Sequence, residues 1–350
     1  MSLTYLFFLS SGLFLGWSLG ANDVSNIFGA AVGSKMLKFK TAAVIASVFI
    51  IIGAVFGGSG TTQTLSMLGE VNALAGSFMV ALSAALTVYF MAKTGLTTST
   101  SQAIVGGIIG WNLYAGKATN LTVLAKIMSG WVICPLLSGL IAVALYFLLK
   151  TFINKMHIHI LMQHQLLRLG LILSGAFCTY ALGANNIANV MGVFVDSAPF
   201  QTVSAGFFTF SPEQILFFLG AVAISVGIFT YSQKVMATIG NHLMKMSPFI
   251  AFIVVLSQAL VLFLFSSSSL HDALLALHLP AFPLVPVSST QAVIGAILGI
   301  GLLKGGRGIN WSIVLRIVAG WFTTPVATLL ICFVSLFFLE NVFQLKVFLP

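Results

Sequence analysis

The stretch "LGANDVSNIFGAAV", residues 19–32, decides the fold of this chain, because it is repeated as "LGANNIANVMGVFV" at residues 182–195. The residues that precede the first copy, "LTYLFFLSSGLFLG" at 3–16, are apolar enough to form a membrane helix. Each copy therefore carries Asn or Asp side chains into an apolar segment. Polar side chains at matching places of two repeats indicate a shared functional role rather than an accident of one helix.

Two further sequence pairs follow in the same order along the chain. "TSTSQAIVGGIIG" at 98–110 matches "VSSTQAVIGAILG" at 287–299, and "KIMSGWVICPLLSGLIA" at 126–142 matches "RIVAGWFTTPVATLLIC" at 316–332. Three pairs in one order predict two homologous halves. We assign residues 1–150 to the first membrane repeat, 151–165 to a cytoplasmic linker and 166–350 to the second repeat.

The composition places the chain in the lipid bilayer. Hydrophobic residues make up 59% of it and charged residues 6%, whereas soluble domains carry about 25% charged residues, and the mean hydropathy is +1.10. The net charge of +9 comes from Lys and Arg between apolar segments, which favours a role in membrane topology over nucleic-acid binding. We expect a multi-pass protein of the inner or plasma membrane, with three cysteines that pack as small apolar side chains.

The charges between segments predict that the halves face opposite ways. Lysines occur in "GSKMLKFK" at 33–40, after the first motif, but the matching loop at 196–213 has no Lys or Arg. The next loop carries Glu70 in the first half, whereas its match carries Lys234 and Lys245. Because Lys and Arg stay on the cytoplasmic side, this double reversal predicts inverted repeats with an outside N-terminus. Each half then crosses the membrane an odd number of times, as in secondary transporters.

The hydroxyl-rich motifs predict an anion site. Each opens with Ser and Thr and continues as a Gly-rich apolar helix too short to span comfortably, which suits a re-entrant segment. Helix N-termini offer unpaired N–H groups and a partial positive charge, so two such starts that meet in the membrane would bind an oxyanion. The candidate anion ligands are Ser99, Thr100, Ser101, Ser288, Ser289 and Thr290, with Gln102 and Gln291 as their neighbours.

The Asn-rich motifs predict the cation side of the site. Gly20 and Gly183 allow helix breaks or close backbone approach. Amide and carboxylate oxygens suit a small hard cation such as Na⁺, although Asp23 could instead carry a proton or accept a hydrogen bond from a protonated phosphate. The candidate residues for Na⁺ or coupling are Asn22, Asp23, Asn26, Asn185, Asn186 and Asn189.

Simpler interpretations exist for each feature. GxxxG spacing would explain the glycines of the first motif as helix contacts, but it leaves the polar side chains that recur in the second motif unexplained. The Ser and Thr residues could be ordinary helix caps. Lys93, just before the first hydroxyl motif, either attracts anions or sets topology.

At these motifs the chain resembles the PiT family of inorganic phosphate transporters. "GANDVSN" and "GANNIAN" are similar to its GANDVAN-like motifs, and "TTSTSQ" and "PVSSTQ" to its PVSTTH-like motifs. The resemblance covers both halves. It implies two inverted repeats with broken helices and re-entrant hairpins, a homodimer, and cation-coupled phosphate uptake with phosphate on the Ser/Thr array and Na⁺ at the Asn/Asp motif.

The sequence departs from the family pattern at named positions. Asn186 stands where the family usually has Asp, and Gln102 and Gln291 stand where it has His, which removes one charge and two proton carriers. The first array, "LTTSTSQ", also lacks the usual Pro.

Taken together, the sequence predicts an all-α polytopic membrane protein with about 10–12 membrane segments. We expect a secondary active transporter that imports inorganic phosphate with a Na⁺ or H⁺ gradient by alternating access, without a bound cofactor. The alternatives are a sulfate or other tetrahedral oxyanion permease of the same fold and, with less support, an anion channel. An enzyme is not expected, because no cluster of catalytic or metal-ligating residues is visible.

Overall fold

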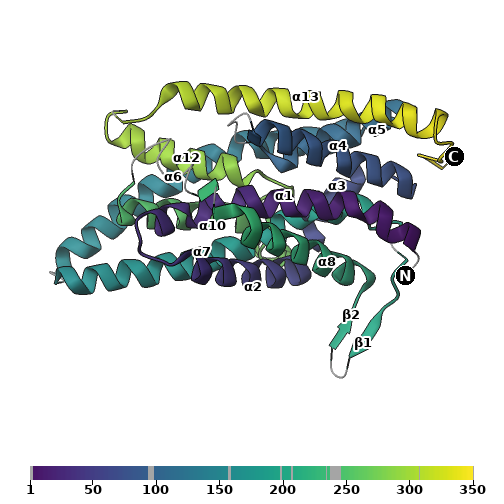
Figure 1. Ribbon diagram of the computed structural model, residues 1–350. Coiled ribbons are helices and arrows are strands. Elements are labelled where there is room, and N and C mark those ends of the chain that lie inside the picture. Colours follow the sequence, from purple (N-terminus) through teal and green to yellow (C-terminus); the bar gives the residue numbers. More distant parts are fainter. Residues whose placement is uncertain are drawn as a thin grey trace.

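The computed structural model describes residues 3–93, 98–156, 159–197, 199–205, 208–233, 235–236, 246–306 and 308–349, which fold into a helical bundle (Figure 1). The first half contains α1 (Leu3–Gly33), α2 (Phe39–Gly57), α3 (Ser59–Leu68), α4 (Leu74–Lys93), α5 (Thr100–Tyr114) and α6 (Leu121–Met156). The second half contains α7 (Ile160–Met191), η1 (Gly192–Phe194), α8 (Pro212–Gly227), η2 (Ile228–Ser232), α10 (Pro248–Ser266), α11 (Ser268–Ala276), α12 (Ser289–Leu303) and α13 (Trp311–Asn341). A short antiparallel hairpin, β1 (Val203–Ala205) and β2 (Phe208–Phe210), precedes α8.

The helices are those of a multi-pass integral membrane protein. Within the described residues, eight helices are long and apolar enough to cross a membrane. The two helices that begin at the hydroxyl motifs, α5 and α12, have 15 residues each, or about 22 Å, and are too short to cross a core of about 30 Å. The length of these two helices agrees with the prediction of re-entrant segments.

The two halves run in opposite directions. In Figure 1 α1 starts at the end of the bundle where both termini lie, and α7 starts at the opposite end, where α6 meets it. The first half therefore crosses an odd number of times, which agrees with the inverted repeat expected from the charges. Lys234 and Lys245, which contributed to that expectation, lie outside the described residues.

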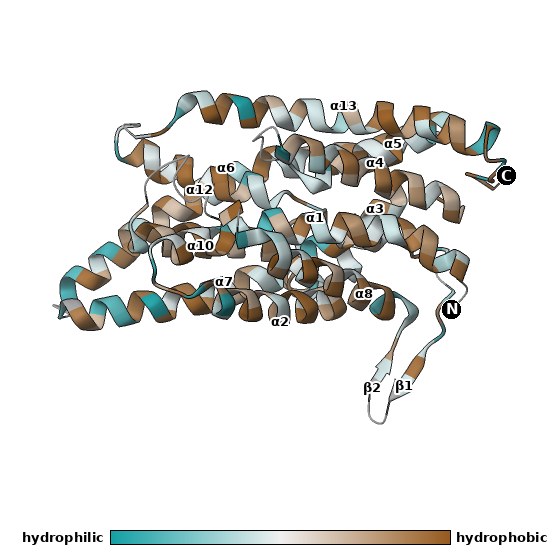
Figure 2. Ribbon diagram, in the orientation of Figure 1, coloured by the Kyte–Doolittle hydropathy of each residue, from teal (hydrophilic) through white to brown (hydrophobic). Residues whose placement is uncertain are grey.

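The predicted linker at 151–165 is largely helical. Helix α6 continues to Met156 and α7 begins at Ile160. The 36 residues of α6 span about 54 Å, so the helix projects beyond an apolar core of about 30 Å. Figure 2 shows hydrophilic residues on these projecting ends.

Of the two roles predicted for the glycines of the Asn motifs, a helix break or a close backbone approach, the structure contains the second. Both α1 and α7 continue without interruption through Gly20 and Gly183, so neither motif offers unwound carbonyl groups. These glycines instead allow close helix contact: an added Cβ at Gly20 would lie 1.9 Å from the carbonyl oxygen of Ile224, and one at Gly183 would lie 2.4 Å from that of Ile50. Interruptions occur elsewhere, at Gly58 between α2 and α3 and at the π-helical turn η2 after α8.

The short helices lock the two halves together. Helix α5 packs against α13 of the other half, and α12 packs against α6. An added Cβ at Gly106 would lie 2.2 Å from the Pro325 carbonyl oxygen, and one at Gly295 would lie 2.1 Å from that of Pro135. Each glycine thus admits the backbone carbonyl of a proline inside a long helix of the other half, and these two contacts hold the starts of α5 and α12 in place.

Candidate functional site

The starts of α5 and α12 have the same cap. Ser99 precedes α5 in an extended conformation, and its side chain accepts a hydrogen bond of 3.3 Å from the N–H of Gln102. Ser288 precedes α12 in the same way and accepts a bond of 3.3 Å from the N–H of Gln291. Serine is a preferred residue at this position because its oxygen satisfies one unpaired N–H of the first turn. The capping alternative for the Ser/Thr motifs therefore holds for these two serines.

The two helix starts face each other. The hydroxyl of Ser101 donates to the carbonyl oxygen of Val287 at 3.1 Å, and the hydroxyl of Thr290, its match in the second repeat, donates to that of Thr98 at 3.2 Å. Each start therefore bonds the residue that precedes the cap of the other. The predicted meeting of the two hydroxyl arrays is present, and all six predicted anion ligands are buried.

The remaining pair of hydroxyl groups lies at the first helical positions. Thr100 and Ser289 lie beside the carboxyl group of Asp23 on α1, which is 3% exposed. The hydroxyl of Ser289 is buried and makes no well-aligned hydrogen bond with another described residue. Because the first-turn N–H groups of both helices also lack partners within the helix, this space contains hydrogen-bond donors from two helices and one carboxyl group.

Helix α7 contributes a second set of buried amides. Asn189 donates to the hydroxyl oxygen of Ser101 at 2.8 Å and to the side-chain oxygen of Asn186 at 2.9 Å. Ser101 also lies 3.4 Å from that Asn186 oxygen. The Nδ2 of Asn186 and the Oδ1 of Asn189 are buried and have no partner among the described residues. One hydrogen-bond donor, from Asn186, and one acceptor, from Asn189, are therefore available to a ligand beside the start of α5.

Asn185 holds the extended segment before α12. Its oxygen accepts from the N–H of Val287 at 3.1 Å, and its amide donates to the carbonyl oxygen of Val285 at 3.4 Å. The side chain thus pairs with the backbone as a neighbouring strand would. Asn185 therefore stabilises the segment that leads into α12.

Asn22 and Asn26 lie apart from this cluster. Both are half-buried on α1, and Asn22 donates to the carbonyl oxygen of Ser18 in its own helix at 2.9 Å. Their matches in the second repeat, Asn185 and Asn189, are fully buried. The structure therefore brings Asp23 to the helix starts, whereas no hydrogen bond among the described residues joins Asn22 or Asn26 to them.

Three buried glutamines surround the helix starts, and one of them was missed by the sequence analysis. Gln258 of α10 donates to the carbonyl oxygen of Ser289 at 3.3 Å. It stands alone as an amide in the apolar run of α10, which could have pointed to it. The side-chain oxygens of Gln102, Gln258 and Gln291 are all buried without a partner in the described part of the chain. They are further acceptors for water, a cation or a protonated ligand.

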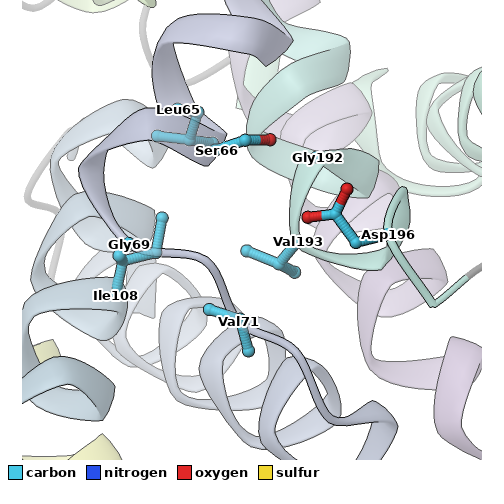
Figure 3. A pocket seen from close by; sticks show the side chains of 8 residues that line it. All are labelled: Leu65, Ser66, Gly69, Val71, Ile108, Gly192, Val193 and Asp196. Atoms are coloured by element: carbon cyan, nitrogen blue, oxygen red, sulfur yellow. The ribbon is translucent and has the colours of Figure 1, made fainter. Parts of the chain in front are cut away.

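A separate small pocket is unrelated to these residues. It has a volume of about 10 Å³, which is room for about one water molecule, and contains none of the predicted site residues. Figure 3 shows its lining from α3, α5, η1 and adjacent loops, by Leu65, Ser66, Gly69, Val71, Ile108, Gly192, Val193 and Asp196. Within the described residues, no group of three His, Cys, Asp or Glu side chains forms a metal cluster.

Comparisons with known proteins show the family to which the chain belongs. The model of a family described as "Phosphate transporter family" matches residues 19–164 and 153–332, one match for each repeat. A "Putative phosphate permease" of Methanocaldococcus jannaschii is 28% identical over 92% of this chain and 93% of its own length. A protein of the same description from Pyrococcus abyssi is 26% identical over 91% of this chain and 94% of its own length.

A solved structure has the same fold. The structure described as the sodium-dependent phosphate transporter superposes with a TM-score of 0.73 at 22% identity, over 96% of this chain and all of that one. The family match covers both inverted repeats and both pairs of polar motifs. This chain belongs to the phosphate transporter family.

Proposed function

We propose that the protein imports inorganic phosphate together with a cation, and that the anion binds between the starts of α5 and α12. The observation that carries this proposal is the position of the Thr100 and Ser289 hydroxyl groups beside the Asp23 carboxyl group. Donors from two halves of opposite orientation converge there on one buried acidic side chain. The names of the relatives and of the solved neighbour support phosphate as the anion.

The helix starts suit an anion that is bound and then released. Two helix N-termini each contribute a partial positive charge of about +0.5 and several free N–H groups. No Lys or Arg occurs among the buried residues of the described chain. Hydrogen bonds without a fixed cation would hold a hydrated oxyanion loosely enough for exchange with water, as transport requires.

Asp23 favours phosphate over sulfate. Phosphate near neutral pH keeps at least one proton and can donate it in a hydrogen bond to a carboxylate, whereas sulfate has none to donate. A sulfate ion here would leave the buried Asp23 carboxylate unpaired and facing another negative charge, which is unfavourable in a site of low polarity. Because sulfate would be unfavourable beside Asp23, a sulfate permease is the second candidate after a phosphate transporter.

Na⁺ fits the residues present as the coupling ion. Na⁺ prefers oxygen ligands, and the carboxyl group of Asp23 and the unpartnered oxygens of Ser289 and Asn189 are such ligands. A cation near Asp23 would offset the charge of the incoming phosphate. The solved neighbour is described as sodium-dependent, and a proton carried by Asp23 is the other way to supply this charge.

The inverted repeats supply a mechanism for crossing the membrane. The site lies between hairpins that enter from opposite ends of the bundle, so a small movement of the two halves would open it to one side at a time. The hydrogen bonds between the two helix starts would break and re-form in that movement. Alternating access of this kind needs no continuous pore.

The experiment that tests this function is uptake of radiolabelled phosphate into proteoliposomes with Na⁺ and pH gradients imposed separately. We expect concentrative uptake with an inward Na⁺ gradient, and its abolition in Asp23→Asn. Uptake driven by the pH gradient alone would identify H⁺, rather than Na⁺, as the coupling ion. Sulfate uptake that excess phosphate does not inhibit would refute the phosphate assignment, and downhill flux indifferent to both gradients would indicate a channel.

A further inference from the structure

Lys93, the last residue of α4, lies level with the middle of helix α1 rather than with either of its ends. Helices α1 and α4 run side by side in the same direction, because the ring of Phe78 stacks on that of Phe7 at 5.4 Å and the ring of Tyr89 lies 6.1 Å from that of Phe14. Lys93 follows Tyr89 by one helical turn. The corresponding turn of α1 reaches Ser18, the midpoint of the helix Leu3–Gly33.

The surroundings of Lys93 are aromatic and polar. Its ammonium group lies 4.7 Å from the centre of the Tyr89 ring, and Tyr231 lies within electrostatic range. Tyr231 belongs to the π-helical turn η2, and its ring lies 5.7 Å from that of Trp17, close to the midpoint of α1. The indole of Trp17 donates to the hydroxyl of Thr230 in the same turn at 2.9 Å. These contacts also put Lys93 near the level of Trp17.

The side chain of Lys93 is exposed at that depth. An ammonium group in contact with hydrocarbon at the membrane centre is strongly unfavourable, so charged side chains there face other polar groups or a water-filled cavity. Among the described residues no carboxylate forms an ion pair with Lys93, and Tyr231 is 38% exposed beside it. Exposure of Lys93 at this level is best explained by a water-filled vestibule that enters the bundle from one side.

Such a vestibule would serve one half of the molecule. Beyond the depth of Lys93, the next two turns of α1 carry Asn22 and Asn26, which are half-exposed, whereas the matching Asn185 and Asn189 of α7 are fully buried. The position that matches Lys93 in the second repeat is Phe282, whose ring packs 5.4 Å from that of Phe265. The positive charge thus has no equivalent in the other repeat.

We propose that Lys93 recruits the oxyanion from this vestibule and delivers it to the start of α5, which begins seven residues later at Thr100. The inference rests on the proposed function and adds an accessory anion-recruiting residue to it. A fixed positive charge in a narrow aqueous space raises the local concentration of anions, and it acts over about 10 Å at 0.1 M salt. Lys93 lies outside the buried cluster, so its charge acts on arrival and departure of the anion rather than on the bound state.

The test compares Lys93→Gln with Lys93→Arg in phosphate uptake over a range of phosphate concentrations. We expect Lys93→Gln to raise KM about threefold to tenfold with little change in kcat, and Lys93→Arg to restore KM. The difference from wild type should shrink at high ionic strength. Lys150→Gln is the matched control, since Lys150 lies 5.5 Å from the Tyr146 ring one turn earlier in α6. An unchanged KM in Lys93→Gln at low salt would overturn the proposal.

A second measurement tests the vestibule without transport. Lys93→Cys should react with a charged, membrane-impermeant thiol reagent from one side of the proteoliposome, whereas Cys134, Cys178 and Cys332 are buried and should not. Absence of labelling from both sides would refute the vestibule. If wild type carries a different oxyanion and Lys93→Gln raises KM for that ion, the phosphate assignment fails while the role of Lys93 stands.

Discussion

The hydroxyl of Ser101 on α5 donates a hydrogen bond of 3.1 Å to the carbonyl oxygen of Val287, ahead of α12. The bond joins helix starts that lie 186 residues apart in the chain, and Thr290 returns it to Thr98. The three hydroxyl positions of each motif therefore divide their tasks. The first caps its helix, the second faces Asp23 and the third fastens the two halves together.

The third position should matter more in α5 than in α12. Ser101→Ala removes the bond to Val287 and also the acceptor for Asn189, whereas Thr290→Val removes the single bond to Thr98. At about 1 kcal/mol for each hydrogen bond, we expect Ser101→Ala to lower the unfolding temperature in detergent by roughly twice as much. Equal destabilisation by the two variants, measured by tryptophan fluorescence during heating, would contradict this division.

The second position should control phosphate affinity. Thr100→Val keeps the shape of the side chain but removes the hydroxyl beside Asp23. A hydrogen bond to a charged ligand contributes about 1.5–3 kcal/mol, so phosphate binding should weaken about tenfold to a hundredfold. Thr100→Ser should retain most of the affinity. Isothermal titration of the purified protein with phosphate at fixed Na⁺ measures the difference.

A control for Thr100→Val is available at the cap. Ser99→Ala removes the side-chain acceptor for the Gln102 N–H, and it should reduce stability by about 0.5–2 kcal/mol with a smaller effect on affinity. If Ser99→Ala weakened phosphate binding more than Thr100→Val does, the assignment of Thr100 as the ligand-facing residue would be wrong.

The single mismatch between the Asn motifs should set the cation requirement. Asn186→Asp places a second carboxylate where Asn189 and Ser101 can both donate to it. Two carboxylates require more compensating positive charge than one, so the dependence of phosphate uptake on Na⁺ concentration should become steeper. The measurement is the Hill coefficient for Na⁺ in proteoliposomes. An unchanged coefficient in an active variant would place the coupling ion away from Asn186.

The control for Asn186→Asp is the neighbouring Asn185→Asp. Asn185 donates to the Val285 carbonyl oxygen, and a carboxylate there would repel that oxygen and release the segment before α12. We expect loss of stability and of uptake together, without a change in the steepness of the Na⁺ dependence.

The repeats and the polar motifs were predictable from the sequence, because two inverted halves retain similar sequence motifs and differ in the charge of their matching loops. The meeting of the hydroxyl arrays followed from their positions, and the structure contains it. Of the two outcomes expected at Gly20 and Gly183, a helix break or a close backbone approach, the structure contains the second, since these glycines accommodate the carbonyl oxygens of Ile224 and Ile50. A glycine in an apolar helix permits both outcomes, and only the packing partner decides between them.

The role of single side chains depended on contacts that no local pattern records. Asn22 and Asn185 occupy equivalent positions in the two motifs. Asn22 nevertheless forms a hydrogen bond within its own helix, whereas Asn185 forms one with the distant segment before α12. Gln258 was missed because a single amide in an apolar run belongs to none of the three repeated motifs. Both differences arise from the arrangement of one half against the other.

Two glycines, Gly106 and Gly295, allow the close contacts that join the halves. Gly106→Ala and Gly295→Ala would place a Cβ within 2.2 Å and 2.1 Å of the carbonyl oxygens of Pro325 and Pro135. Backbone carbonyls cannot move aside as a flexible side chain can, so α5 and α12 would be pushed away from α13 and α6. Overpacking of this kind costs about 1–3 kcal/mol, and the displaced helix start would lose its bonds to the opposite one.

We therefore expect both alanine variants to lose stability and phosphate uptake together. Gly33→Ala is the control, because an added Cβ at this helical glycine meets no atom within 4 Å. Size-exclusion chromatography after heating, combined with uptake, measures both effects. If Gly106→Ala and Gly295→Ala behaved like Gly33→Ala, the close contact between each short helix and the proline carbonyl could not be what positions the two helix starts.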